Sequence, residues 1–284
     1  NADDASWTGE SLTFPKIQGA DVCGYIVEVG KNIDSSRIGE RVLLEPSLQK
    51  INGKQLENPW YLGSECDGGF AQYTVVSNEH AYKINSTYTD IELASFPCSY
   101  STAENLLTRA NVNQNDVVLI SGASGGVGSA AIQLAKARGA KVIAITSPSK
   151  FDEIKSLGAS QVISRHDDIV EVLGKSSINV VIDLVAGEAW GKFLEVLKAK
   201  GRYAVSGAIA GPIVELDIRT LYLKDLSFFG CTVLEAEVFG NLIKKIENKD
   251  IKPLVAKIYP LENIVDAQKE FLKKKHIGKI VFSI

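Results

Sequence analysis

The sequence predicts an α/β protein whose core is a doubly wound parallel sheet, and three observations predict it. Strand-like apolar runs alternate with helical segments from Asp116 onward, as in such a sheet. Within residues 117–140, a strand, a glycine-rich turn and a helix follow one another directly. Residues 14–82 instead show the short apolar runs and glycine turns of a β-rich region. We therefore expect a β-rich domain beside an α/β domain.

The first third of the chain should consist mainly of strands. Residues 22–29 alternate loosely between apolar and polar side chains, and residues 41–44 form a short apolar run. Residues 68–76 follow a glycine turn and are expected to form another strand. The intervening residues 45–67 are polar, and we expect them to be irregular.

The remainder of the chain supplies the alternating elements. A helical pattern covers residues 92–112, with Pro97 marking a start or a kink. Strands of the sheet are expected at residues 117–121, 142–146, 161–163, 180–183, 203–206 and 226–230, with helices between most of them, such as 151–157 and 189–197. The tail adds helices at 238–249 and 264–274 and a strand at 279–284. This mixed tail suggests that it folds back on the first domain.

Composition excludes several classes of function. A chain of 284 residues is long enough for two domains, and its net charge of −3 gives no basic footprint for nucleic acid. No apolar run reaches the length of a membrane span. Its four cysteines are scattered without a C-x-x-C pair, so we expect a reducing, cytoplasmic environment. The chain has no methionine and begins in a polar, loop-like segment, residues 1–9, so we expect further sequence upstream.

The turn between the first strand and the first helix of the sheet reads A-x-G-x-x-G, a form of the dinucleotide-binding fingerprint. In this pattern Gly125 lets the backbone approach a pyrophosphate, and Gly128 lets the helix pack closely on the strand. The helix N-terminus offers N–H groups and a positive dipole end to the phosphates. The residues expected to contact the cofactor here are Ser124, Gly125, Gly126 and Val127.

The end of the second strand distinguishes NAD(H) from NADP(H). NAD enzymes carry an acidic residue there, about 20 residues after the glycines, which binds the ribose 2′-hydroxyl group. Here Thr146 stands 18 residues beyond Gly128, and Ser147 and Lys150 follow. Hydroxyl and ammonium groups bind phosphate, and Arg165 after the third strand can reach the same phosphate or lie over the adenine. The sequence therefore favours NADPH, although Lys150 alone is also compatible with a solvated charge at a helix start.

Several segments together resemble the medium-chain dehydrogenase/reductase superfamily. They are residues 15–24 with 27–30, 38–42, 67–73, 122–128 and 276–281, and the turn GASGGVG is typical of the quinone-oxidoreductase branch. The resemblance implies a central Rossmann domain and a GroES-like substrate domain built from both chain ends. The implied boundaries are 1–96 and 232–284 for the GroES-like domain and 97–231 for the Rossmann domain. Relative to the family, the first strands of the GroES-like domain are missing.

The resemblance also implies contacts to the nicotinamide end of the cofactor. These belong to the start of the helix that precedes the sheet and to loops at the carboxyl ends of the later strands. The residues are Thr102, Val185, Ala208, Ile209, Cys231 and Val233. The edge strand 226–230 would pair two chains in a homodimer, as is frequent in the family.

A catalytic zinc ion is not expected. Zinc-dependent alcohol dehydrogenases place a His-Glu pair after the glycine that corresponds to Gly19, whereas this chain has Ala20 and Asp21. Cys98 falls at a later ligand position of those enzymes, but a catalytic site needs three protein ligands, and a free cysteine is often simply packed. Cys66 alone cannot form a structural zinc site. Asp21 is the candidate catalytic residue, a group that polarises a water or a substrate oxygen, or else an ordinary loop carboxylate.

Three functions stay open at this point. The leading prediction is an NADPH-dependent reductase that acts without zinc on a small-molecule quinone, enone or aldehyde, because this chemistry needs little beyond a hydride donor held against an electrophilic carbon in a dry cleft. A zinc-dependent alcohol dehydrogenase with an atypical ligand set, including Cys98, is the nearest alternative. A non-catalytic NADPH-binding redox sensor is the third. None of them calls for a nucleic-acid or membrane partner.

Overall fold

The computed structural model describes residues 13–284, so the predicted loop 1–9 lies outside the described residues. The chain divides into two compact units. The central unit consists of Ser99–Val238 and Asp250–Lys252. The terminal unit joins the residues up to Cys98 with Phe239–Lys249 and Pro253–Ile284. Both ends of the chain therefore contribute to one unit.

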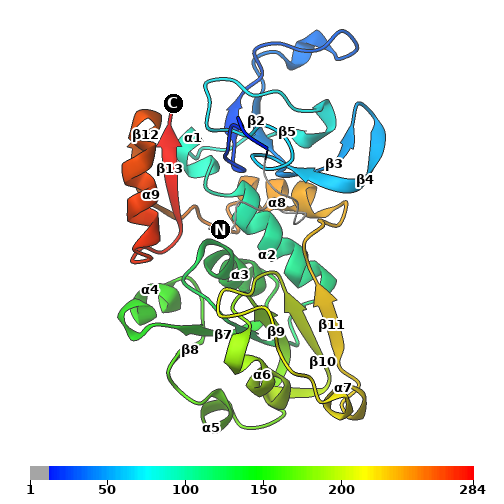
Figure 1. The fold of residues 1–284 in the computed structure, drawn as a ribbon, viewed down its shortest axis with the longest axis vertical. Coiled ribbons are helices and arrows are strands. Elements are labelled where there is room, and N and C mark those ends of the chain that lie inside the picture. Colours follow the sequence, from blue (N-terminus) through cyan, green and yellow to red (C-terminus); the bar gives the residue numbers. More distant parts are fainter. Residues whose placement is uncertain (1–12) are drawn as a thin grey trace. The chain divides into compact units, whose positions relative to one another are not determined.

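The central unit is built around a six-stranded parallel sheet (Figure 1). The chain enters it in the middle at β6 (Val117–Ile120), moves outward through β7 (Lys141–Thr146) and β8 (Gln161–Ser164), and returns to the other side of β6 through β9 (Ile178–Asp183), β10 (Leu197–Val205) and β11 (Ser227–Gly230). All neighbouring pairs are parallel. The predicted doubly wound Rossmann sheet is confirmed. Its direction of winding reverses between β6 and β9, where ligands of such sheets bind.

Helices cover both faces of this sheet. Leu119 of β6 packs in one buried cluster with Trp190 and Phe193 of α6 (Trp190–Val196), whereas Val118 and Ile120 point to the opposite face. Val118, Leu119 and Ile120 are fully buried. The helix α3 (Gly126–Ala137) packs against β6 and β7. The other helices of this sheet are α4 (Phe151–Ser156), α5 (Ile169–Leu173) and α7 (Ile218–Leu223).

The predicted helix 92–112 is divided in two. The short helix α1 (Asp90–Leu93) begins with a capping box, in which the Thr89 hydroxyl accepts from the Glu92 N–H and the Glu92 carboxylate accepts from the Thr89 N–H. The longer helix α2 (Pro97–Arg109) follows. Pro97 is therefore a helix start rather than a kink, because proline suits the first turn, where no intrahelical donor is needed.

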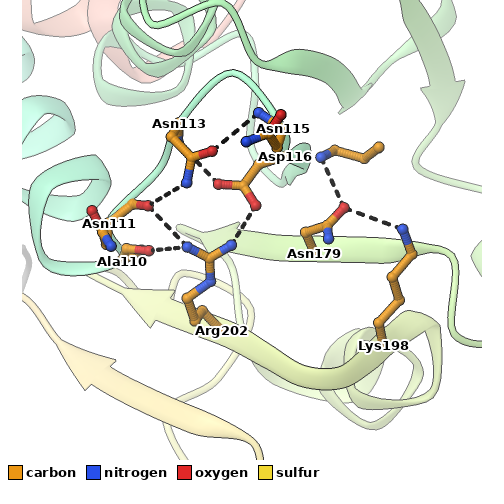
Figure 2. A network of polar contacts seen from close by, with 9 residues as sticks. Ala110, Asn111, Asn113, Asn115, Asp116, Asn179, Lys198 and Arg202 are labelled. Carbon is orange, nitrogen blue, oxygen red and sulfur yellow. Dashed lines mark hydrogen bonds and ion pairs between the residues drawn. The ribbon is translucent and has the colours of Figure 1, made fainter.

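A polar network ties the end of α2 to the amino ends of the strands (Figure 2). Arg202 of β10 donates from Nη1 to the carbonyl groups of Ala110 (2.8 Å) and Asn111 (2.9 Å). Its Nη2 pairs with the carboxylate of Asp116, which also accepts from the Asn113 N–H at 2.9 Å. The network fixes the turn between α2 and β6 at the edge opposite to the glycine turn, so its role is structural.

The described part of the terminal unit contains three small sheets. They are the antiparallel sheet of β1 (Cys23–Tyr25), β2 (Arg41–Leu44) and β5 (Ala81–Lys83), the hairpin of β3 (Ser47–Ile51) and β4 (Lys54–Tyr61), and the parallel pair of β12 (Val255–Pro260) and β13 (Lys279–Ser283). Its helices in the second half of the chain are α8 (Val238–Glu247) and α9 (Ile264–Leu272). Across residues 13–284, none of the helices combines the length and the apolar character needed to cross a bilayer.

The hairpin of β3 and β4 corrects the prediction that residues 45–67 are irregular. Its turn residues Asn52 and Gly53 have φ angles of 51° and 75°, as in a type I′ turn. The mostly exposed side chains of β4 give no clear apolar alternation, so periodicity does not reveal the strand. The Asn-Gly pair is the signal in the sequence that favours a hairpin.

The prediction of a strand at residues 68–76 is wrong, because no part of this described segment forms a strand. The first residues of the segment instead form hydrogen bonds to residues 17–19. The Gly68 N–H donates to the Ile17 carbonyl (2.8 Å), and the Phe70 N–H donates to the Gln18 carbonyl (2.9 Å). Val75 is 94% exposed. The predicted strand 22–29 is likewise reduced to β1. A strand needs a backbone partner along its length. Residues 23–25 have one in β2, whereas the rest of the two segments belongs to none of the sheets within residues 13–284.

Candidate functional site

The glycine turn of the central unit leaves the N-terminus of α3 open. β6 ends at Ile120, and α3 begins at Gly126, after Gly125, which provides no capping side chain. The first N–H groups of an α-helix have no acceptor within the helix, and the helix dipole adds partial positive charge there. This end of α3 can therefore bind phosphate groups.

Two glycines of this turn differ in what they contact. A Cβ atom at Gly128 would lie 2.4 Å from the carbonyl oxygen of Gly122 and 2.7 Å from the Cα atom of Ala123, so α3 can pack here only with glycine. A Cβ atom at Gly125 would meet nothing nearer than 3.4 Å, and the φ angle of −74° suits any residue. The fold does not require glycine at position 125. The open cradle fits the close approach of a pyrophosphate.

A lysine from the next loop reaches this turn. The Lys150 ammonium group donates to the Ser124 hydroxyl at 3.5 Å. Burial chiefly lowers the pKa of Lys150, the Glu153 carboxylate opposes this, and the Arg165 guanidinium group lowers it further. Lys150 and Arg165 are thus close enough to interact electrostatically. The sequence proposed Lys150 and Arg165 for the same phosphate, and in the structure Lys150 interacts with both Ser124 and Arg165.

The end of β7 carries no acidic residue. Thr146 is 4% exposed, and its hydroxyl oxygen is enclosed without a hydrogen-bond partner among residues 13–284. Its carbonyl accepts from the Arg165 N–H at 2.9 Å, which fixes the start of the arginine loop beside β7. Ser147 is half-buried, as is Lys150. Ser147, Lys150 and exposed Arg165 are therefore better placed than Thr146 to meet a ligand from solvent.

The loops after β9 and β10 meet at the point where the winding of the sheet reverses. A Cβ atom on Gly122 of the glycine turn would lie 3.2 Å from Cγ2 of Val185 in the β9 loop. The Val185 carbonyl accepts from the Ala210 N–H at 2.9 Å, which joins the β9 and β10 loops. Ala208 and Ile209 of the β10 loop are exposed. The structure thus places these three predicted contacts at the carboxyl edge of the sheet.

The remaining predicted cofactor contacts also belong to the central unit. Cys231 is buried, and its N–H donates to the Val205 carbonyl at 2.9 Å. Val233 is 42% exposed, and its carbonyl accepts from Nδ2 of Asn105 in α2 at 2.9 Å. Thr102 lies half-buried on the same helix. Asn105 therefore links α2 to the segment that follows β11.

In the terminal unit, Asp21 has partners on both carboxylate oxygens. Oδ1 accepts from the backbone N–H of Cys98 at 2.7 Å, and Oδ2 accepts from the Lys279 ammonium group at 2.7 Å. Burial opposes the charge of Lys279, but Asp21 and Cys98 outweigh it and raise the pKa of this lysine. Lys279 was not among the predicted site residues. Its only signal in the sequence is its place in the closing segment that resembles the family.

Asp21 and Cys98 do not form a complete metal site. Among residues 13–284, no three His, Cys, Asp or Glu side chains are grouped so that they could hold a metal ion. Lys279 supplies the cation that pairs with Asp21. Cys66 lies elsewhere in the unit, where its thiol donates to the Tyr61 carbonyl and burial raises its pKa. The described residues therefore fit a lysine–carboxylate pair better than a three-ligand zinc site.

Two family models match the chain. The alcohol dehydrogenase GroES-like domain family matches residues 1–86, and the zinc-binding dehydrogenase family matches residues 126–248. The NAD-dependent alcohol dehydrogenase of Sulfolobus acidocaldarius is 30% identical over 288 residues, which is 96% of this chain and 83% of that protein. The acryloyl-coenzyme A reductase of Metallosphaera sedula is 32% identical over 284 residues, covering 96% and 84%.

Another relative and a solved structure point the same way. The quinone oxidoreductase of Homo sapiens is 27% identical over 272 residues, covering 91% of this chain and 77% of the human protein. A solved structure from Sinorhizobium meliloti 1021, assigned as an alcohol dehydrogenase, superposes with a TM-score of 0.89 at 44% identity, covering 95% of this chain and 76% of that one. Together with the Rossmann sheet and its glycine turn, these matches show that the chain belongs to the medium-chain dehydrogenase/reductase superfamily of NAD(P)-dependent oxidoreductases.

Proposed function

We propose that this oxidoreductase uses NADPH to reduce a small quinone, enone or aldehyde without a catalytic metal. The observation that carries the proposal is the Lys150–Ser124 contact beside a second strand that ends without a carboxylate. An acidic residue there would accept hydrogen bonds from ribose hydroxyl groups and repel a 2′-phosphate. An ammonium group beside a hydroxyl attracts one.

The residues that would hold the cofactor belong to successive loops of the sheet. The N-terminus of α3 would bind the pyrophosphate, and Ser147, Lys150 and Arg165 would bind the adenosine 2′-phosphate. Val185, Ala208 and Ile209 would line the nicotinamide end, with Thr102, Cys231 and Val233 as further contacts. When bound, the nicotinamide supplies the hydride. The protein's own part is to orient it and to exclude water from the reacting carbon.

Asp21 supports the metal-free form of this proposal. Both of its oxygens are engaged, one by the Cys98 N–H and one by Lys279, so a zinc ion would have to displace an ammonium group at 2.7 Å. Relatives named quinone oxidoreductase and acryloyl-coenzyme A reductase support a quinone or an activated carbon–carbon double bond as the electron acceptor. The relative named NAD-dependent alcohol dehydrogenase makes zinc-dependent alcohol oxidation the alternative to be tested.

The exposed edge of the central sheet supports a homodimer. β11 is an edge strand, and the segment before it carries exposed apolar side chains, including Ile213 (89%), Tyr222 (60%) and Leu223 (72%). Two copies that pair along β11 would satisfy the free backbone groups and cover apolar surface. We expect light scattering of the purified protein to give the mass of two chains. A monomer at micromolar concentration would contradict this part of the proposal.

The test measures cofactor choice and turnover together. We expect NADPH to bind about 10- to 100-fold more tightly than NADH, which corresponds to roughly 1.4–2.8 kcal/mol. We expect NADPH oxidation with a quinone, an enone or an aldehyde from a small panel, in the presence of a chelator. Equal affinities for NADPH and NADH would overturn the cofactor assignment. Tight NADPH binding without turnover of any acceptor would indicate a sensor, and zinc-dependent oxidation of alcohols would indicate the alcohol dehydrogenase.

Lys150→Ala isolates the group on which the proposal rests. It should weaken NADPH roughly tenfold or more and leave NADH almost unchanged, because only NADPH has the 2′-phosphate. Lys155→Ala is the matched control, since Lys155 is an exposed lysine of the following helix α4. The control variant should bind both cofactors as the wild type does. If Lys150→Ala lowers the affinities for NADPH and NADH equally, the lysine does not bind the 2′-phosphate.

A further inference from the structure

A buried carboxylate lies under the loops at the carboxyl edge of the central sheet. Asp183 is the last residue of β9 and is 0% exposed. Its Oδ1 atom accepts from the Ser121 hydroxyl (2.5 Å) and the Val185 N–H (2.9 Å). Oδ2 accepts from the Tyr203 hydroxyl (2.6 Å), and both oxygens accept from the Ala186 N–H (3.2 Å each). Side chains and backbone groups from three strand ends therefore converge on one residue.

The partners of Asp183 are neutral donors rather than cations. No Lys, Arg or His in the described part of the chain forms an ion pair with it. Burying a carboxylate without a cation costs free energy unless hydrogen bonds satisfy its lone pairs. An apolar residue would fill this core position at a lower cost in free energy. Asp116 is a buried carboxylate at the other edge of the same sheet. Unlike Asp183, it is paired with a cation, the guanidinium group of Arg202 (Figure 2).

The hydrogen bonds of Asp183 stabilise an unusual backbone conformation at Ala186 and Gly187. Ala186 has φ 53° and ψ −138°, a combination that residues with a side chain rarely adopt, and Gly187 follows with φ 68°. The Ala186 N–H is bound by both carboxylate oxygens. Such a conformation persists only where its surroundings determine it.

The same contacts reach the neighbouring loops. Ser121, which donates to Asp183, also accepts from the Leu184 N–H at 2.8 Å and directly precedes Gly122 of the glycine turn. The Val185 carbonyl accepts a hydrogen bond from the Ala210 N–H and so connects the β9 loop to the β10 loop. A Cβ atom at Gly207 would lie 2.8 Å from the Leu184 carbonyl oxygen, so the loops also touch through backbone. The shape of this edge thus depends on where Asp183 places residues 184–187.

We propose that Asp183 is a positioning residue for the nicotinamide half of the cofactor site, acting through the β9 loop and supported by Ser121 and Tyr203. The proposal rests on the proposed function, because it takes these loops as the nicotinamide side. It also makes a distinction within the site. The groups near Lys150 belong to the loops after β6, β7 and β8, whereas Asp183 organises the loops after β9 and β10. Loss of Asp183 should damage one half of the site and spare the other.

The experiment compares Asp183→Asn with Asp116→Asn, using 2′,5′-ADP as a probe of the adenine half and NADPH as the full cofactor. Asparagine keeps the size of the side chain but turns one acceptor oxygen into a donor. For Asp183→Asn we expect 2′,5′-ADP affinity within about twofold of the wild type, with kcat or NADPH affinity lowered roughly 10- to 100-fold, the scale of small misplacements in an active site. Asp116→Asn should lower thermal stability and leave both ligands unchanged.

Two results would overturn the inference. One is an Asp183→Asn protein that binds NADPH and turns over as the wild type does. The other is an equal loss of 2′,5′-ADP and NADPH, which would mean a general role in folding. If Asp183→Asn does not fold, Tyr203→Phe removes a single donor and should change NADPH binding or kcat in the same direction by a smaller factor, and wild-type values for both would also overturn the inference. Failure of the cofactor assignment is seen separately, in the wild type's choice between NADPH and NADH.

Discussion

The two candidate sites of the molecule are built in different ways. At the carboxyl edge of the central sheet, loops are fixed by backbone contacts so close that Gly128 and Gly207 admit no side chain, and by a carboxylate with no exposure. In the terminal unit, whose described sheets have two or three strands, Asp21 is held by one backbone N–H and one lysine. The first arrangement combines contacts between sequence neighbours, such as Asp183 with Val185, and contacts across 20 to 63 residues, such as Asp183 with Tyr203 and Leu184 with Ser121. The second depends on a pair separated by 258 residues.

The difference teaches where substitutions should alter function without altering the fold. Tight backbone packing leaves only particular positions of the glycine turn free for a ligand. An ion pair between two distant segments of the chain instead combines support of the fold and any role at the site in the same side chains. The predictions below test this contrast, beginning with the largest expected effect.

Gly125→Val should abolish cofactor binding while the protein stays folded. The φ angle of Gly125 suits valine, and its Cβ position has no neighbour closer than 3.4 Å, so the branched side chain occupies only the space in front of the turn. We expect NADPH affinity to fall at least about 100-fold, because a pyrophosphate needs that space. Titration calorimetry and circular dichroism measure the two properties. Unchanged NADPH affinity in the folded variant would remove the glycine turn from the site.

Gly128→Ala is the companion to this variant, with the opposite expectation. Its Cβ atom would lie 2.4 Å from the Gly122 carbonyl oxygen, and that backbone cannot move without shifting β6 or α3. Overpacking of this kind costs about 1–3 kcal/mol, which lowers the Tm by several degrees in a unit of this size. A Gly128→Ala protein as stable as the wild type would contradict the packing role assigned to this glycine.

The contrast also explains how much could be predicted from sequence. Each strand–turn–helix unit of the central sheet has its own local pattern, so the six strands and the glycine turn are predictable. The strand expected at residues 68–76 fails because pairing is not a local property. Lys279 and Asp183 escape prediction for a related reason. Nothing around either residue in the sequence indicates its partner, and only the fold brings Asp21 or Tyr203 within hydrogen-bond distance.

The next prediction concerns the ion pair of the terminal unit. Lys279→Met should destabilise the protein by about 1–3 kcal/mol in urea unfolding, since it leaves the Asp21 carboxylate partly buried with a single donor. Asp21→Asn should cost less, and the double variant should cost less than the sum of the two, because the partners are coupled. Additive effects would show that the pair is not energetically coupled. If Asp21→Asn instead lowers kcat about 100-fold at unchanged stability, Asp21 acts on the substrate rather than on the fold.

Two tyrosines, the buried Tyr203 of the central unit and the half-buried Tyr82 of the terminal unit, should make stability fall at alkaline pH. Burial and then the Asp183 charge raise the pKa of Tyr203, and burial and then the Glu45 charge raise the pKa of Tyr82 to about 12. The folded protein therefore retains these protons while the unfolded chain loses them above about pH 10. Stability should be insensitive to these groups below that pH and should decrease from pH 10 to 12. Tyr203→Phe and Tyr82→Phe should each flatten the decrease, and an unchanged slope in both would contradict the assignment.

The smallest effect is expected from removing metal. We expect the purified protein to contain far less than one zinc ion per chain and to keep its reductase activity in a chelator, because a site with fewer than three protein ligands binds zinc weakly. Cys98→Ser should then change little, since Cys98 donates to Asp21 through its backbone N–H, which serine retains. We expect a stability change below about 1 kcal/mol, as for most substitutions outside a tightly packed core. One zinc per chain by elemental analysis, with activity lost in the chelator and restored by zinc, would contradict this prediction. Cys98→Ser should in that case lose both the metal and turnover, and the terminal unit would carry a metal centre instead of an ion pair.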